Sequence, residues 1–173
     1  VLNSFPNSPL AIRSSCFAED TNERSNAGAF RSLTNVPSQI GAINHAFKDV
    51  MAAYGKELVG QVVLIQLMVQ NIALSGVVLT TDLNAYTPYI VINYHKGPNP
   101  TVVTSGGKKT HILKYFPNKK YKINSQFQKL VHEILNLKKI YNCELDVEFC
   151  IDKNNKVFIL QVRKLNIPIK KKD

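Results

Sequence analysis

Apolar and polar positions recur along the chain in patterns that predict two helices. In the first, expected at 38–54, apolar residues return at steps of three and four, and Pro37 and Gly55 stand where a start and a stop belong. The second, expected at 125–142, has the same spacing, with Asn124 or Ser125 as its N-cap. The predicted apolar positions are Ile40, Ile43, Phe47, Val50 and Tyr54 in the first helix, and Phe127, Leu130, Val131, Ile134, Leu137 and Tyr141 in the second.

Runs of apolar and β-branched residues predict the strands, at 10–13, 62–69, 76–81, 88–94, 144–151 and 156–163. Two pairs are expected to be hairpins, one around Asp82–Thr87 and one around the turn 152–155. The polar segment 14–36 is expected to be a long functional loop, and the basic stretch 106–122 a linker. Mixed strands with two helices predict an α+β fold.

Length, composition and cysteine spacing indicate the number of domains and the compartment of the protein. Its 173 residues, 45% of them hydrophobic, suit one domain or one domain of two lobes. No apolar run reaches the length of about 18 residues needed to cross a bilayer, and the abrupt start lacks a signal-peptide pattern and is typical of a fragment. Cys16, Cys143 and Cys150 lack CxxC spacing, so we expect reduced thiols in a cytoplasmic protein without a membrane partner.

The net charge of +10 raises the question of a nucleic-acid partner. Much of the charge lies in 106–122, in Lys138–Lys139 and in the tail Lys170–Lys172, without the signature of a nucleic-acid-binding module. We therefore expect no nucleic acid, because the phosphates of a small ligand suit the charge equally well. RNA binding by a basic domain remains a third hypothesis, and its affinity would fall steeply with salt.

The hairpin 144–163 gathers polar side chains that suit a metal and a phosphate. Since strand side chains alternate between faces, Asp146 and Glu148 share one face, and Gln161 and Arg163 share a face of the partner strand. Magnesium takes oxygen ligands, and arginine pairs with phosphate. The alternative is a half-solvated hairpin with cross-strand ion pairs worth about 0.2–1 kcal/mol each. The other face of the second strand is expected to carry Phe158, Leu160 and Val162.

A second polar constellation follows the strand 10–13. Arg13 closes that strand, Ser14 and Ser15 come next, and Gly28 lies further along. Arginine with hydroxyl groups and a glycine suits a phosphate contact. An ordinary polar loop is the alternative.

Three collinear blocks carry a resemblance to a known family. Residues 11–36 (AIRSSCFAEDTNERSNAGAFRSLTNV) resemble the "VRSSATAEDLP-ASFAGQ" segment of the phosphoenolpyruvate synthase and pyruvate phosphate dikinase family. Residues 62–82 (VVLIQLMVQNIALSGVVLTTD) resemble its "VQ-MV…-SGV-FT-D" segment, and 144–163 (ELDVEFCIDKNNKVFILQVR) its "DIEWA-D-G-I-ILQ-R" hairpin.

The resemblance implies a partial ATP-grasp domain over 1–173, with its N-terminal portion missing. Such a domain has mixed or antiparallel sheets with flanking helices and holds ATP and Mg²⁺ between two lobes. Residues 1–60 would supply the Arg-Ser-Ser phosphate loop and a helix. Residues 61–173 would supply the strand for the adenine and the metal-binding hairpin.

The resemblance also implies a role for each matching position. Arg13 would contact the phosphates of ATP, the loop from Ser14 and Ser15 to Gly28 would close over them, and Arg163 would stabilise the transferring phosphoryl group. Arg13 and Arg163 are thus the catalytic candidates.

In the remaining blocks, Glu148 would ligate Mg²⁺, Gln161 would lie beside the metal and the phosphates, and Asp146 would support that site. The adenine would pack against Gln66, Leu67, Met68 and Val69. A core strand with one satisfied amide is the alternative for Gln66 and Met68.

Three departures from the family pattern concern a carboxylate, a lysine-bearing segment and a histidine. The family's "GLGE" segment corresponds to YHKGPNPTVVTSG (94–106), which has no carboxylate. The early lysine-bearing segment near "GGKG" has no counterpart, and His45, His95, His111 and His132 lack the "SHAA"-like setting of the phosphorylated histidine.

The implied function is the ATP-binding part of a dikinase. Such an enzyme transfers a phosphoryl group from ATP to a histidine on another domain and then to a small acceptor, releasing AMP and phosphate. Its partners would be a phosphohistidine domain and an acceptor domain, so this chain alone is expected to be incomplete. The alternative is a non-catalytic nucleotide-binding or interaction module that retains the fold.

Overall fold

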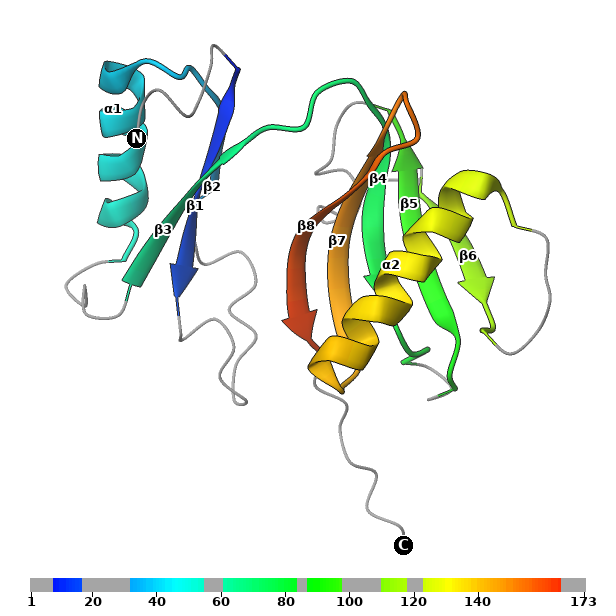
Figure 1. Cartoon of the computed structure of the whole chain (residues 1–173). Helices are drawn as coiled ribbons and strands as arrows, with labels where there is room; N and C mark the ends of the chain where they lie inside the picture. The colour runs from blue at the N-terminus through cyan, green and yellow to red at the C-terminus, as the bar shows by residue number, and fades with distance from the viewer. Residues whose placement is uncertain are drawn as a thin grey trace, which may run out of the picture. The chain divides into compact units, whose positions relative to one another are not determined.

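The chain folds into two antiparallel sheets, each with one helix, in an α+β architecture (Figure 1). The computed structural model describes residues 8–16, 32–54, 61–83, 87–97, 110–117 and 123–165. Contacts divide the chain into a first unit, Val1–Met68, and a second unit, Val69–Asp173. The sequence suggested a division after residue 60. The division lies further along because the strand that follows residue 60 pairs within the first unit.

The first unit contains β1 (Leu10–Cys16), β2 (Ser32–Val36), α1 (Ile40–Ala52) and β3 (Gln61–Leu67), with the strand order β2-β1-β3. The expectation of a loop over all of 14–36 is wrong at both ends. Residues 14–16 continue β1 because their backbone pairs with Gln61–Val63 of β3, and 32–36 form β2. The central part, 17–31, lies outside the described residues.

Helix α1 covers one face of this sheet. Its buried residues are Ile43, Ala46 and Val50, and the Tyr54 hydroxyl just beyond it donates a 2.6 Å hydrogen bond to the Val62 carbonyl. Two predicted core positions are wrong: Ile40 is 61% exposed and Phe47 is 40% exposed. A three-stranded sheet covers a narrower stripe than the apolar spacing of the helix offers. The buried cluster consists of Leu10, Ile12, Val36, Ile43, Ala46, Val50 and Tyr54.

The second unit has a five-stranded sheet in the order β6-β5-β4-β7-β8. Its elements are β4 (Ile72–Leu79), β5 (Ile90–Lys96), β6 (His111–Tyr115), α2 (Ser125–Tyr141), β7 (Leu145–Asp152) and β8 (Val157–Lys164). Both predicted hairpins are confirmed, and an isolated bridge joins Asp82 to Thr87 in the first. Strand β6 lies in the stretch expected to be a linker. That expectation is wrong because 111–115 pair with the edge of β5.

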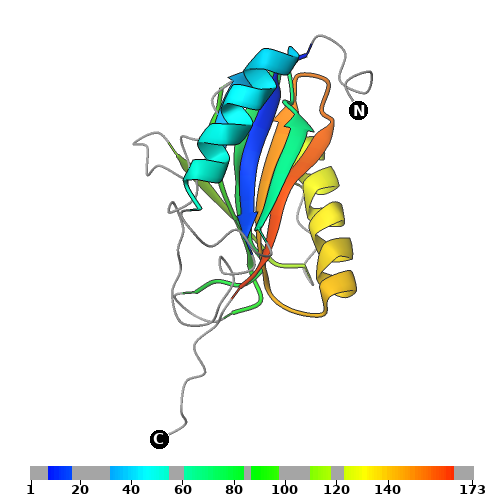
Figure 2. The ribbon, with the colours of Figure 1, turned by 90° about the vertical axis from the view of Figure 1, so that its left-hand side faces the viewer.

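Helix α2 lies along one face of the five-stranded sheet (Figure 2). The Asn124 side chain caps it by accepting a 3.2 Å hydrogen bond from the Gln126 amide, and Asn142 ends it in a left-handed conformation. The predicted stripe of the helix is buried at Phe127, Leu130, Val131 and Ile134, whereas Tyr141 is exposed. No helix in the described part of the chain is long and apolar enough to cross a membrane.

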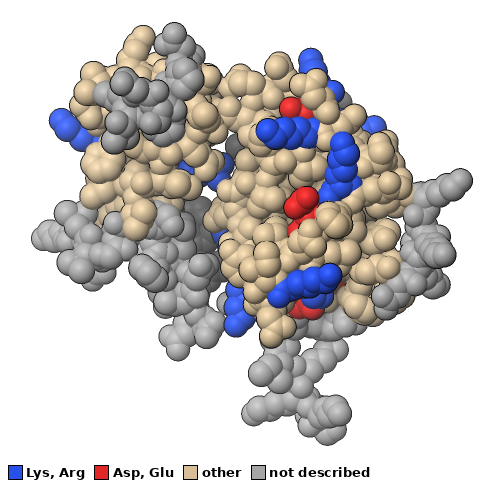
Figure 3. Space-filling model, viewed as in Figure 1, with Lys and Arg blue, Asp and Glu red and all other residues tan. Residues whose placement is uncertain are grey.

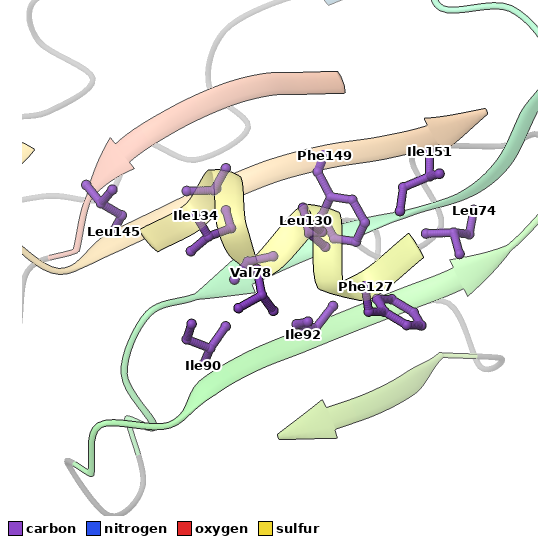
Figure 4. Close-up of a cluster of buried hydrophobic side chains, with 12 residues drawn as sticks. Leu74, Val78, Ile90, Ile92, Phe127, Leu130, Ile134, Leu145, Phe149 and Ile151 are labelled. Atoms are coloured by element: carbon purple, nitrogen blue, oxygen red, sulfur yellow. The ribbon is translucent and has the colours of Figure 1, made fainter. Parts of the chain in front are cut away.

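The core of the second unit lies between α2 and the sheet (Figure 4). Every second residue of β7 points into it, from Leu145 to Ile151, as the period of two requires. The other side chains of β7 therefore belong to the opposite face of the sheet. The fully buried core residues include Val78, Ile90, Ile92, Leu130, Ile134, Leu145, Val147, Phe149 and Ile151.

Candidate functional site

The β7–β8 hairpin places the two carboxylates opposite the guanidinium and the amide. Asp146 pairs with Arg163, and Glu148 pairs with Gln161. Because the residues between them pack under α2, these four side chains belong to the face of the sheet opposite α2. The cross-strand arrangement that the alternation predicted is therefore confirmed.

One detail of that prediction is wrong, because β8 does not alternate regularly. The register shifts so that Glu148 pairs with Gln161 while Phe149 pairs with Ile159, which leaves Leu160 as the extra residue of a bulge. Residues Val157, Ile159 and Val162 pack against the core. Phe158 pairs with Cys150 instead and lies on the face opposite α2, not with Val162 as the sequence suggested.

Two rows of side chains cross the face opposite α2, because the strand registers align them. One row is Gln161, Glu148, Val77, Asn93 and Ile112, and the other is Arg163, Asp146, Leu79, Val91 and Lys114. Neighbouring strands lie about 4.8 Å apart, so the hairpin members of each row are direct neighbours. Polar groups thus gather on β7 and β8, while β4 supplies apolar side chains beside them.

Asp146 has an unusual electrostatic environment. Burial raises its pKa above the usual value, and the nearby Glu148 charge also raises this pKa, while Arg163 acts in the opposite direction. The Oδ1 atom of Asp146 is buried and makes no hydrogen bond with the described residues. Buried carboxylate oxygens normally have a hydrogen-bond, water or ion partner. A cation beside Asp146 and Glu148 would supply such a partner.

The residues on this face fit a magnesium ion whose coordination is completed by phosphate oxygens. The described residues contain no group of three or more histidine, cysteine, aspartate or glutamate side chains suited to a metal. Magnesium usually takes one or two protein carboxylates and completes its shell with water and phosphate oxygens. Glu148 with the Gln161 amide oxygen, and Asp146 nearby, matches such a partial ligand set.

Arg13 and Ser14 lie in the middle of β1, not at a strand end. Arg13 pairs with Leu64 of β3 and with Ser32 of β2. Since Leu10 and Ile12 pack against α1, Arg13 belongs to the opposite face of the three-stranded sheet. The side chain of Ser15 and the whole of Gly28 lie outside the described residues.

The four residues proposed for the adenine straddle the end of β3. Gln66 pairs with Ala11, and by alternation it shares the face of Arg13. Leu67 is 46% exposed, the Met68 amide donates to the Pro9 carbonyl at 2.9 Å, and the Met68 sulfur lies 2.9 Å from the Asn35 amide nitrogen. Val69 begins the second unit. The structure thus places Gln66 and Arg13 on the same face of the first sheet, and the four hairpin residues on the same face of the second sheet.

Sequence reasoning missed two polar contacts in the second unit. The Lys114 ammonium lies 2.5 Å from the Asp82 carboxylate, whose side chain is 7% exposed. The Thr80 hydroxyl donates to Glu144 at 2.5 Å and accepts from the Leu145 amide at 2.7 Å. These partners are far apart in sequence and have no local spacing signal. The sequence signal that could have indicated these contacts is the run of buried polar residues Thr80, Thr81 and Asp82 after an apolar strand.

The surface that carries α2 shows basic and acidic side chains interspersed (Figure 3). One such pair joins Lys138 to Glu144 at 2.7 Å. A nucleic-acid interface usually has basic side chains clustered on one face, and this view of the second unit shows no such cluster. Cys143 and Cys150 carry free thiols.

No family model matches the sequence, and a search of curated proteins finds no match.

Proposed function

We propose that the chain is the ATP-binding part of a dikinase-type phosphotransferase with an ATP-grasp fold. Glu148 and Gln161 bind Mg²⁺, Asp146 supports that site, and Arg163 neutralises charge on the transferring phosphoryl group. The β-phosphoryl group of ATP passes to a histidine on another domain and then to a small acceptor, while the γ-phosphoryl group is transferred to water and leaves as phosphate, so that AMP is released. The site suits this role because phosphoryl transfer needs positioning and charge neutralisation more than covalent chemistry from the protein.

One observation carries the proposal: the register of the β7–β8 hairpin. It brings two carboxylates, an amide and a guanidinium together on one sheet face. An ordinary surface hairpin would leave its carboxylates hydrated or paired, whereas Asp146 keeps a buried oxygen without a hydrogen bond from the described residues. The two sequence blocks around Arg13 and Gln66 add a cation and a strand suited to a nucleotide.

Isothermal titration calorimetry tests the binding step. Wild-type protein is titrated with ATP in the presence and absence of Mg²⁺, and the same titrations are repeated with Glu148→Gln. Losing one carboxylate ligand should weaken Mg–ATP binding by about tenfold or more, while binding of metal-free ATP changes little. Glu133→Gln is the matched control, because Glu133 is an exposed glutamate on α2.

Arginine variants test the phosphate contacts. Arg13→Met and Arg163→Met should each weaken ATP binding with or without the metal, because both remove a bidentate phosphate partner. The proposal fails if wild-type protein binds neither ATP nor Mg²⁺. It also fails if Glu148→Gln and Glu133→Gln bind Mg–ATP equally well.

A non-catalytic module with the same fold is the second candidate. It is favoured by the segment 94–106, which contains no carboxylate where the resembling family has one. The two candidates differ in phosphoryl transfer. In this test a phosphohistidine domain from a dikinase is added, together with ATP labelled in its γ- or β-phosphate. If the chain is catalytic, the γ label should appear as phosphate and the β label as protein-bound phosphoryl. If it is not, ATP should stay intact.

A further inference from the structure

A groove of about 640 Å³ lies beside β8 and α2, and its lining includes none of the four hairpin side chains of the candidate site. Helix α2 forms one wall with Lys129 and His132, and the β7–β8 turn forms another with Asn154. Val157 and Ile159 of β8 contribute apolar side chains. The volume falls within the range of roughly 300–1,000 Å³ typical of ligand sites.

Strand β8 is an edge strand. In the described part of the sheet it has one neighbour, β7, so its other edge offers backbone N–H and C=O groups to a further strand. The first half of β8 is a continuous apolar run, Val157–Leu160, without proline or charge. Edges of this kind are templates for strand addition, and the bulge at Leu160 limits the regular part to its beginning, beside the groove.

The turn that borders the groove is held in one conformation by its own hydrogen bonds. The Asp152 carboxylate accepts from the Asn154 amide at 2.8 Å and from the Lys156 amide at 2.9 Å. The Lys153 amide donates to the Asn71 carbonyl at 2.9 Å, which fixes the turn to the start of β4. A preorganised rim lowers the entropy cost of binding.

Lys129 offers the groove a positive charge that an acidic side chain can pair with. Lys129 makes no ion pair with another described residue, so its ammonium group is available at the rim. Lys156 also belongs to the lining, but its ammonium lies 4.9 Å from the centre of the Phe158 ring, on the face opposite α2, so Lys129 supplies the positive charge of the groove. Glu133 is the one carboxylate of the lining.

From this combination we propose that the groove binds a short, extended, acidic peptide segment of a partner protein. The segment adds as a strand to the edge of β8, which is a recurring mode of peptide recognition. An apolar side chain lies over Val157 and Ile159, and an acidic side chain two residues away, on the same face, pairs with Lys129. This function is independent of the proposed nucleotide binding.

Fluorescence anisotropy with a designed probe tests the proposal. The probe is fluorescein-labelled Ser-Val-Thr-Glu-Thr-Val-Ser, whose two valines and glutamate share one face of a strand, measured at low salt. We expect a Kd on the order of 100 µM. A probe with lysine in place of glutamate should bind about tenfold more weakly, and a probe N-methylated at alternate amides should not bind, because it cannot complete the ladder.

Two charge-reversal variants on the same helix locate the binding site. Lys129→Glu should weaken binding of the glutamate probe by about tenfold, whereas Lys139→Glu, with the same charge change outside the groove, should leave it unchanged. Circular dichroism checks that both variants fold. Mg–ATP should not displace the probe, because the groove lining includes none of the four hairpin side chains of the candidate site. If the protein does not bind nucleotide, the result with the probe is therefore unaffected.

Three outcomes would overturn the proposal. The N-methylated probe binds as well as the parent, which would exclude strand addition. The Lys129 and Lys139 variants behave alike, which would place binding elsewhere. Inorganic phosphate at low concentration displaces the probe completely, which would make the groove a site for a small anion.

Discussion

The hydroxyl of Thr80 should contribute more to stability than its size suggests. Thr80 is 1% exposed at the end of β4. Its Oγ1 donates to the Glu144 carboxylate and accepts from the Leu145 amide, and its own amide donates to the Leu145 carbonyl at 3.0 Å. It therefore joins β4 to the start of β7, one residue before Asp146.

Thr80→Val keeps the shape of the side chain and removes both side-chain hydrogen bonds. The buried Leu145 amide is then left without its partner, which costs about 1–3 kcal/mol, and the charge-assisted bond to the partly exposed Glu144 is replaced by water. We expect the free energy of unfolding to fall by about 2–3 kcal/mol. Thr80→Ser keeps both bonds and should lose about 1 kcal/mol with its methyl group.

Thr81→Val is the matched control in the neighbouring position. Its hydroxyl donates to the Thr87 carbonyl, which also accepts from the Asp82 and Tyr89 amides. No buried group is left without a partner, so the loss should stay below about 1 kcal/mol.

Urea unfolding followed by far-ultraviolet circular dichroism measures these differences, because the chain has no tryptophan. Hydrogen exchange of the Leu145 amide should also accelerate in Thr80→Val and not in Thr80→Ser. Equal urea midpoints for Thr80→Val and Thr81→Val, with unchanged exchange at Leu145, would refute the reasoning.

Three further predictions follow from burial and close contacts. Gly76→Ala should destabilise the second unit by about 3 kcal/mol or more in urea unfolding, because an added Cβ would lie 2.1 Å from the Asn93 carbonyl oxygen. Val50→Ala, a fully buried position of α1, should cost about 2 kcal/mol in thermal unfolding, whereas Phe47→Ala should cost less than half as much, since Phe47 is 40% exposed; equal costs would mean that α1 packs through a different face. Burial raises the pKa of the Cys150 thiol to about 11, with the Asp152 charge adding to the effect. In a Cys16→Ser, Cys143→Ser background, Cys150 should therefore resist a disulfide reagent until the protein unfolds, and stability should decline as the pH rises from 9 toward 11, because the unfolded thiol ionises first; rapid reaction of the folded protein at pH 8 would contradict the burial.

The sequence predicted the elements with strong local signals and the relation of neighbouring strands. Helix α2 and its Asn124 cap, and the face shared by Asp146 and Glu148, follow from spacing alone. Spacing could not show how much of each stripe is covered. Ile40 stays exposed because coverage depends on the width of the sheet that α1 meets.

Contacts between distant segments were beyond sequence reasoning for a different reason. The strand around Lys114 looks like a basic linker until β5 offers it an edge, and its ion pair with Asp82 exists only in the folded sheet. The segment around Ser14 looks like a loop because its polar residues have low strand preference, yet pairing with β3 overrides that preference. The candidate site could be predicted within one hairpin, whose two strands are adjacent in sequence.

The extra residue at Leu160 changes the phase of side-chain alternation within β8. Upstream of it, odd-numbered side chains belong to the core, and downstream of it even-numbered ones do. Deleting Leu160 would leave a regular alternation, in which Val157, Ile159 and Val162 stay on the core side while Gln161 and Arg163 stay on the opposite face. The strand should therefore tolerate a one-residue deletion at this position, because its apolar half and its polar half would both keep their faces of the sheet.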